Sequence, residues 1–195
     1  MMSQRIGDLA RHTGIYGVGT IAGGLARAAL VPIIARFVPT QEYGKASVVF
    51  IFVSFLSIIA ELGLSSSMIR YINEATDEDE RRQVISTVLM TSLLLATPIL
   101  VVCLVFAERI SVVLLGSSEW KSLILVGLVG GFGGALLQIG LAFERALARS
   151  TRYVLYTVLK GSGALGLSVV LVVVMRKGAL GLVAGNAIPA ALLGI

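Results

Sequence analysis

Six long apolar stretches run along this chain of 195 residues, and short segments rich in charged residues separate them. Each stretch is long enough to cross a hydrocarbon layer of about 30 Å as a helix that rises about 1.5 Å per residue. We therefore predict an all-α integral membrane protein in which residues 1–195 form a single transmembrane domain. The six predicted transmembrane helices are 13–38, 44–64, 84–106, 121–143, 153–175 and 178–195.

Two of the connections between these stretches are longer than turns. Residues 65–83 carry an acidic run that ends in two arginines, and Asp77 to Glu80 have the composition of a helix N-terminus. Residues 107–120 are amphipathic and short, which favours a segment that lies along the membrane interface.

Composition agrees with a membrane protein, because 56% of the residues are hydrophobic and only 14% are charged. The 16 Lys and Arg residues give a net charge of +5 but are scattered between the spans, so nucleic acid is not an expected partner. Cys103 is the only cysteine and His12 the only histidine. We therefore expect no disulfide framework, no metal site, no cofactor and no catalytic residue.

Lys and Arg residues fall slightly more often on the side of the membrane that would hold the N-terminus, which favours a cytoplasmic N-terminus. The last apolar stretch continues to Ile195 without a charged flank, so we expect the sequence to be the N-terminal part of a longer chain.

Small and polar residues align on single helical faces, at spacings of three, four or seven residues. Glycines four residues apart, as at Gly127 and Gly131 or Gly181 and Gly185, predict close helix packing. The polar positions occur in four predicted helices, and a water-filled interior is the simplest common cause. The candidate cavity-lining residues are Tyr16, Thr20 and Arg27 in the first span, Glu61 in the second, Gln138 in the fourth and Lys160 in the fifth.

Arg27 and Lys160 lie well inside their predicted spans, where a charge costs roughly 3 kcal/mol on insertion scales. One interpretation is structural, with either cation paired to Glu61 or extended to an interface. The other is functional, with both cations lining an aqueous cavity that attracts an anionic substrate. Two cations and one acid cannot neutralise each other fully, which slightly favours the second interpretation.

Residues 35–71, "ARFVPTQEYGKASVVFIFVSFLSIIAELGLSSSMIRY", carry a series of short motifs in a recognisable order. This segment resembles the polysaccharide biosynthesis, or oligosaccharide flippase, family of bacterial inner-membrane transporters. That family is part of the multidrug, oligosaccharidyl-lipid and polysaccharide exporter superfamily, and Glu61 stands where it more often has Asp. Weaker similarity continues through residues 143–173. The matching residues are Ala35-Arg36, Pro39, Glu42-Tyr43-Gly44, Glu61-Leu62-Gly63-Leu64 and Ile69-Arg70-Tyr71.

The resemblance implies that six helices form one bundle of a V-shaped transporter of twelve to fourteen helices. It also implies a flippase that moves a polyprenyl-diphosphate-linked oligosaccharide across the bacterial inner membrane by alternating access. The product would serve the synthesis of O-antigen, capsule or exopolysaccharide. The implied partners are the lipid-linked oligosaccharide, the bilayer and other polysaccharide-assembly proteins.

Two alternatives stay open at the level of sequence. A drug or cation antiporter of the same superfamily would need carboxylates within the membrane, and the predicted spans contain only Glu61. A membrane glycosyltransferase or ligase would need converging carboxylates or histidines. The one dense acidic group, Asp77 to Glu80, has the character of a solvated surface run.

Overall fold

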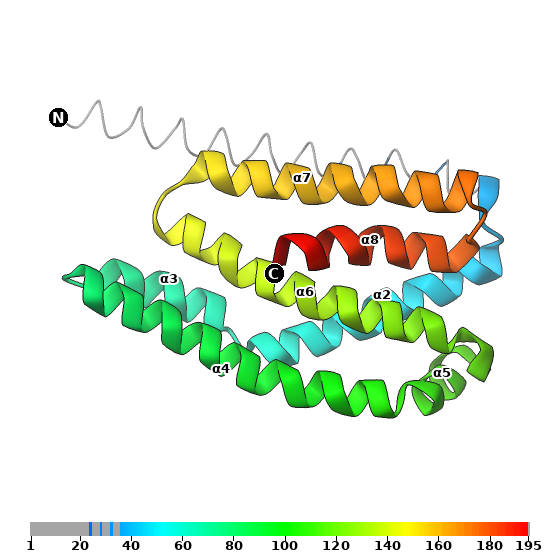
Figure 1. Cartoon of the computed structure of the whole chain (residues 1–195), viewed down its shortest axis with the longest axis horizontal. Coiled ribbons are helices and arrows are strands. Elements are labelled where there is room, and N and C mark those ends of the chain that lie inside the picture. The colour runs from blue at the N-terminus through cyan, green and yellow to red at the C-terminus, as the bar shows by residue number, and fades with distance from the viewer. Residues whose placement is uncertain (1–23, 25–27, 29–31, 33–35, 195) are drawn as a thin grey trace.

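The computed structural model describes residues 24, 28, 32 and 36–194, and residues 36–194 form a bundle of helices that lie roughly along one direction (Figure 1). The predicted first span, 13–38, lies almost wholly outside the described residues. The described helices are α2 (Thr40–Glu61), α3 (Leu64–Glu74), α4 (Glu78–Val105), α5 (Ala107–Leu115), η1 (Ser118–Trp120), α6 (Lys121–Ala146), α7 (Ser150–Val169), η2 (Val170–Val174) and α8 (Gly178–Gly194).

Four helical stretches are long and apolar enough to cross a membrane. They correspond to the predicted spans 44–64, 84–106, 121–143 and 153–175, and they cover Thr40–Glu74, Glu78–Val105, Ser118–Ala146 and Ser150–Val174. The predicted span 178–195 corresponds to α8, which is apolar but has 17 residues. The prediction of a helical membrane protein is therefore confirmed, whereas the number of six spans stays a prediction.

The connection predicted at 65–83 contains a helix that the sequence analysis did not predict, α3 (Leu64–Glu74). Met68 and Ile72 are buried on one side of α3, where they pack with Val88 of α4 and Ile139 of α6. Ser65 is buried on the same face, and the other polar residues of α3 lie mostly on its exposed faces, which hid this apolar stripe in the sequence. The true connection to α4 is Ala75 to Asp77.

The predicted helix N-terminus near Asp77 is confirmed. The Asp77 side chain accepts a hydrogen bond of 2.7 Å from the backbone N–H of Glu80, and the Glu80 carboxylate accepts one of 2.8 Å from the N–H of Thr76. Together they satisfy N–H groups that a helix start leaves without a partner. This acidic run is therefore the cap of a long helix.

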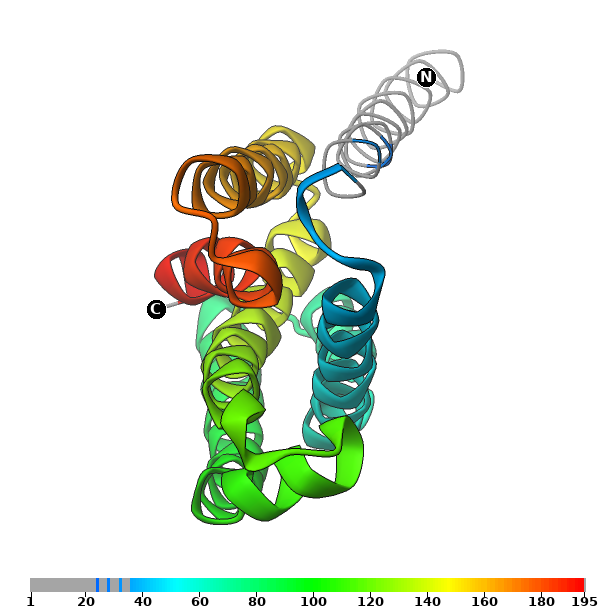
Figure 2. The same ribbon diagram turned by 90° about the vertical axis from the view of Figure 1, so that its right-hand side faces the viewer.

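Helix α8 packs against α6, α7 and α2, and lies between α6 and α7 toward one side of the described bundle (Figure 2). Its core partners include Val49 of α2 and Ile124 and Leu128 of α6, which pack with Leu182 and Val183. The outward faces of the bundle carry exposed apolar side chains, such as those of Ile51, Phe55 and Ile58 on α2 or Met90 and Leu94 on α4. An apolar exterior around a packed interior is suited to lipid.

Glycines provide the close contacts at the centre, as their spacing predicts. A Cβ atom at Gly181 would lie 3.0 Å from the backbone of Leu171, and one at Gly130 would collide with the backbone of Ala187. The polypeptide backbones of α6 and α8 therefore approach each other directly.

Candidate functional site

The six sequence-predicted cavity residues divide into two groups. Tyr16, Thr20 and Arg27 lie outside the described residues, so their position in the bundle stays a prediction. Glu61, Gln138 and Lys160 lie on three different helices.

Lys160 and Gln138 lie at similar depths on neighbouring helices. Measured from the connection between α6 and α7 at about 1.5 Å per residue, Gln138 is about 12 Å along α6 and Lys160 about 15 Å along α7. Lys160 is half-buried and Gln138 is exposed. Both side chains are thus well inside helices that are apolar enough to span a membrane.

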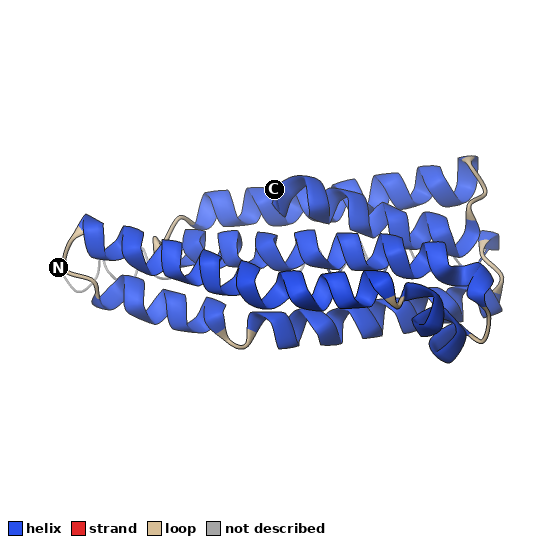
Figure 3. Ribbon diagram, turned by 60° about the horizontal axis from the view of Figure 1, so that its bottom comes forward, coloured by secondary structure: helices blue, strands red, loops and turns tan. Residues whose placement is uncertain are grey.

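Glu61 is the last residue of α2 and directly precedes a break in the helix. Leu62 and Gly63 both have positive φ, 42° and 76°, a conformation that ends α2 before α3 begins (Figure 3). The break separates two segments of one apolar stretch of 35 residues. Interrupted helices in transporters leave backbone groups free to line a binding site, so the break is a candidate part of the site.

The residues at this break were in the sequence motif Glu61-Leu62-Gly63-Leu64, but the sequence did not predict that a helix continues after it. The signal that could have predicted this second helix is the helical spacing of the apolar residues Leu64, Met68 and Ile72. The ion pairs between described residues do not include one between Glu61 and Lys160. The structural interpretation based on that pair therefore has no support from the described part of the chain.

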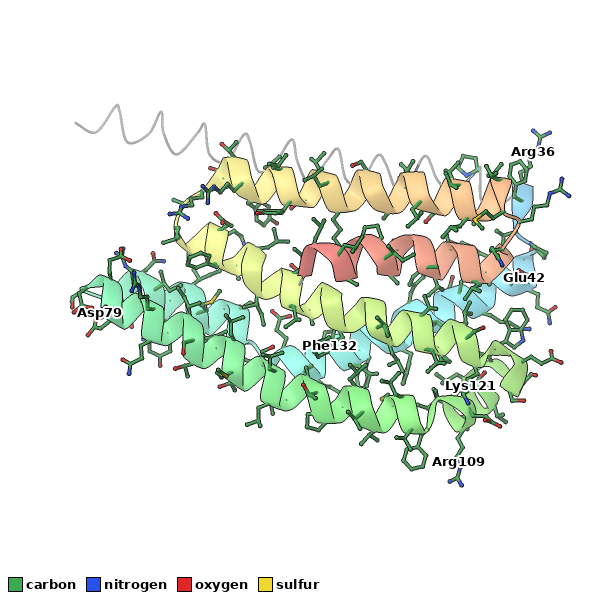
Figure 4. All side chains as sticks on the ribbon, viewed as in Figure 1. Arg36, Glu42, Asp79, Arg109, Lys121 and Phe132 are labelled. Atoms are coloured by element: carbon green, nitrogen blue, oxygen red, sulfur yellow. The ribbon has the colours of Figure 1, made fainter. Side chains whose placement is uncertain are left out.

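A small pocket of about 30 Å³ lies between α2, α4 and α6, close to the break. Phe132 lies on its wall, near the middle of the bundle (Figure 4). Ser57 supplies the only side-chain hydroxyl of the lining, and it already donates a hydrogen bond of 2.9 Å to the carbonyl of Val53. The pocket is thus apolar, with room for about one water molecule.

Several polar residues of the predicted wet faces are satisfied within their own helices. The hydroxyls of Ser47 and Thr157 donate to carbonyl groups four residues earlier, at 2.9 and 2.8 Å. Gly127 and Gly131 of α6 face Val53 of α2 across a tight contact. Gly127 and Gly131 therefore serve helix packing, and hydration of Lys160 and Arg27 stays a prediction.

Glu42, in the family-like motif Glu42-Tyr43-Gly44, joins two distant parts of the chain. Its carboxylate accepts a hydrogen bond of 3.0 Å from the N–H of Ala179, in the first turn of α8. A negative charge at a helix N-terminus is favourable, and Gly178, with φ 51°, allows the carboxylate to come close. The sequence gives no signal for this contact because 137 residues separate its partners.

A second carboxylate that the sequence analysis missed is Glu144. It lies near the end of α6, and only 9% of its surface is exposed. Its Oε1 atom lies 3.9 Å from Arg152 Nη1 of α7. The predicted span ended at residue 143, one residue before it. Among the described residues no group of three or more His, Cys, Asp or Glu side chains is placed to hold a metal ion.

The two ends of the described bundle carry different charged residues. Arg36, Glu42, Arg109 and Lys121 lie toward one end, and Asp79 lies at the other (Figure 4). Lys45 belongs to the first end, where its Nζ atom lies 3.9 Å from the centre of the Trp120 ring. Charges at the ends and apolar side chains between them are the distribution expected of a protein that spans a bilayer.

Comparison with known proteins addresses the family directly. No curated protein and no solved structure matches the chain. The sequence model of the family described as "Polysaccharide biosynthesis protein" matches residues 9–195. Because this match covers nearly the entire chain, and the helices are those of a membrane protein, the chain belongs to the polysaccharide biosynthesis protein family of membrane transport proteins.

Proposed function

We propose that this protein is a flippase that moves a polyprenyl-diphosphate-linked oligosaccharide across the bacterial inner membrane by alternating access. The family match over residues 9–195 is the observation that carries this proposal. The surface polysaccharide served would be O-antigen, capsule or exopolysaccharide. In this proposal the N-terminus is cytoplasmic, and the described helices belong to one of two bundles that rock about the site.

The physical difficulty of this transport is the headgroup. A diphosphate and a chain of sugars lose hydration when they enter hydrocarbon, and the loss is large for the charged phosphates. Cations within the membrane offset this cost while the lipid tail stays in the bilayer. Lys160, half-buried on α7, and Arg27 are the residues proposed for this role.

The break between α2 and α3 fits a transporter that changes shape. Two residues with positive φ separate two helices inside one apolar stretch, so α3 can change its angle to α2 through Leu62 and Gly63 if α4 and α6, against which α3 packs, move with it. Such changes at a few residues at the ends of elements are how hinges work. We therefore propose that the break is the hinge of this half of the transporter.

Thiol labelling tests whether the proposed cations face water. Cys103 is the only cysteine, so Cys103→Ser gives a background without thiols for Arg27→Cys and Lys160→Cys. Leu159→Cys is the matched control, because Leu159 is an exposed apolar residue next to Lys160. We expect a membrane-impermeant thiol reagent to label the first two positions and not the third. No labelling at either cation position would refute the hydrated site.

Activity is tested in a bacterial strain that lacks its own polysaccharide flippase. Restored surface polysaccharide would support the proposed function, and Arg27→Ala should abolish it while leaving the amount of protein in the membrane unchanged. The alternative, cation antiport, predicts that the protein confers drug resistance and does not restore surface polysaccharide. It also predicts that Glu61→Gln abolishes this drug resistance. A normal protein level without either phenotype contradicts both functions.

A further inference from the structure

We propose that the corner between α6 and α7 is a binding site for the phosphate group of a membrane lipid. Arg145, Arg149 and Arg152 lie within eight residues of one another, around the three-residue connection between the two helices. The site lies outside the central bundle and does not depend on which substrate is transported. It is the yellow loop that joins α6 to α7 at the left of Figure 1, separate from the acidic turn between α3 and α4.

The position of the corner brings it to the level of lipid headgroups. Helix α6 and helix α7 belong to two apolar stretches, Ser118–Ala146 and Ser150–Val174, that are each long enough to cross a membrane. Their short connection must therefore lie where the hydrocarbon ends. Lipid phosphates occupy that depth, and basic residues near an anionic membrane surface are attracted by about 1 kcal/mol each.

The backbone of the corner is held in a defined shape. The N–H of Arg149 donates to the carbonyl of Glu144 at 2.9 Å, and the N–H of Ala148 donates to the carbonyl of Arg145 at 3.0 Å. With Ala148 at φ 54°, these two bonds form a Schellman motif that closes the end of α6. The bases of the three arginine side chains are consequently fixed relative to one another.

The arginine side chains are arranged across the corner. The Arg145 guanidinium lies 5.6 Å from the centre of the Tyr153 ring, on the first turn of α7. Arg152 of α7 faces back to Glu144 of α6 at 3.9 Å, and its side chain keeps 63% of its surface exposed. Arg149 is exposed on the connection itself.

Within the described part of the chain, the ion pair between Arg152 and Glu144 is the only one that the three arginines form. The Glu144 side chain is only 11% exposed. Helix α7 has no acidic residue in its first turn and no side-chain cap at its N-terminus, so the helix dipole adds further positive potential. A phosphate group suits this corner, because its several oxygens can accept hydrogen bonds from more than one guanidinium group and its charge is favourable at the helix N-terminus.

The acidic residues at the same end of the molecule do not supply this anion. Arg70 pairs with Glu74 at 2.9 Å, and Arg81 pairs with Glu78 at 3.0 Å, both within the α3 and α4 turn. Asp77 and Glu80 cap α4. Among the described residues, Arg145 and Arg149 form no ion pair, so their charge is available to a ligand from the membrane.

The test compares two variants that each remove two cations. Arg145→Gln with Arg149→Gln changes the corner and leaves the Arg152 and Glu144 pair in place. Arg176→Gln with Lys177→Gln removes two exposed cations between α7 and α8, next to the Glu42 cap. Native mass spectrometry of the full chain in detergent would measure bound phosphatidylglycerol, with phosphatidylcholine as the lipid control.

We expect phosphatidylglycerol binding to weaken about fivefold for each cation removed at the corner, and about 25-fold for the pair. The Arg176 and Lys177 variant should bind as the unchanged protein does. Equal loss in the two variants, unchanged binding in the corner variant, or equal affinity for phosphatidylcholine would overturn the proposal. If the corner variant does not fold, phosphatidylglycerol binding is measured for Arg149→Gln alone. The Arg149 side chain is exposed, so its replacement should not disturb folding.

Two further ligands distinguish the sources of the phosphate. Polyprenyl diphosphate and inorganic pyrophosphate are each added as competitors of phosphatidylglycerol. Competition by polyprenyl diphosphate alone would identify the site as a docking point for the lipid carrier, and competition by neither would identify it as a site for bulk anionic lipid. Both results support a lipid phosphate site, whereas equal competition by pyrophosphate would show that the lipid is not required and would refute it.

Discussion

The contact between Glu42 and the N-terminus of α8 allows a quantitative test of the packing. Replacement of Glu42 by Ala removes both the hydrogen bond of 3.0 Å to the N–H of Ala179 and the negative charge at the helix start. Loss of a helix cap costs about 1 kcal/mol, and loss of a charge that favours the dipole costs about 0.3 to 1 kcal/mol more. We therefore expect Glu42→Ala to lower the free energy of unfolding by about 1 to 2 kcal/mol.

Glu42→Gln separates the two contributions, because its amide oxygen can still accept the hydrogen bond. This variant should lose only about 0.3 to 1 kcal/mol. The assay is reversible unfolding by SDS in mixed micelles, followed by far-ultraviolet circular dichroism.

Glu108→Ala is the matched control for this experiment. Glu108 pairs with Lys121 at 3.3 Å, at the same end of the bundle, but both side chains are about half exposed. Exposed pairs of this kind contribute about 0 to 1 kcal/mol. If Glu42→Ala and Glu108→Ala lower stability equally, the buried cap does not hold α8 in place and the reasoning is wrong.

Four further variants test the packing of the bundle. Gly185→Ala should destabilise the protein by about 1 to 3 kcal/mol, because a methyl group there collides with α7. Gly140→Ala, with open space around it, should be neutral or slightly stabilising. Unfolding by SDS measures both changes in stability. Gly63→Ala should cost about 1 to 2 kcal/mol because its φ is 76°, and a stability equal to that of Gly140→Ala would contradict the break between α2 and α3. Lys45→Gln should remove about 0.5 to 1 kcal/mol of attraction to Trp120, and an unchanged fluorescence of this single tryptophan would count against the contact.

The sequence predicts most of the long helices because their apolar length is a local property. The spans that became α4, α6 and α7 differ from the structure chiefly at their ends. The helix α3 was missed because its polar residues dominate the composition, although Met68 and Ile72 repeat at helical spacing. Residue-by-residue hydropathy thus detects burial in lipid better than burial against other helices.

The candidate site was less predictable because its contacts join distant parts of the chain. No pattern in the sequence connects Glu42 to Ala179, and the burial of Glu144 depends on the neighbouring helices. The glycine spacing of α6 and α8 predicts close helix packing, which the contacts of Gly130 and Gly185 confirm, but it does not predict which helix is the partner. That choice depends on which faces meet, which is a tertiary property.

The order of the helices along the chain sets a constraint on biogenesis. Helix α8 follows α2, α6 and α7 in the sequence and packs against all three. Before α8 has been made, Gly130 and Gly133 of α6 lack the contacts that they make with it, and Glu42 has no helix to cap. The contacts that join α2, α6 and α7 through α8 therefore form only once α8 has entered the bundle.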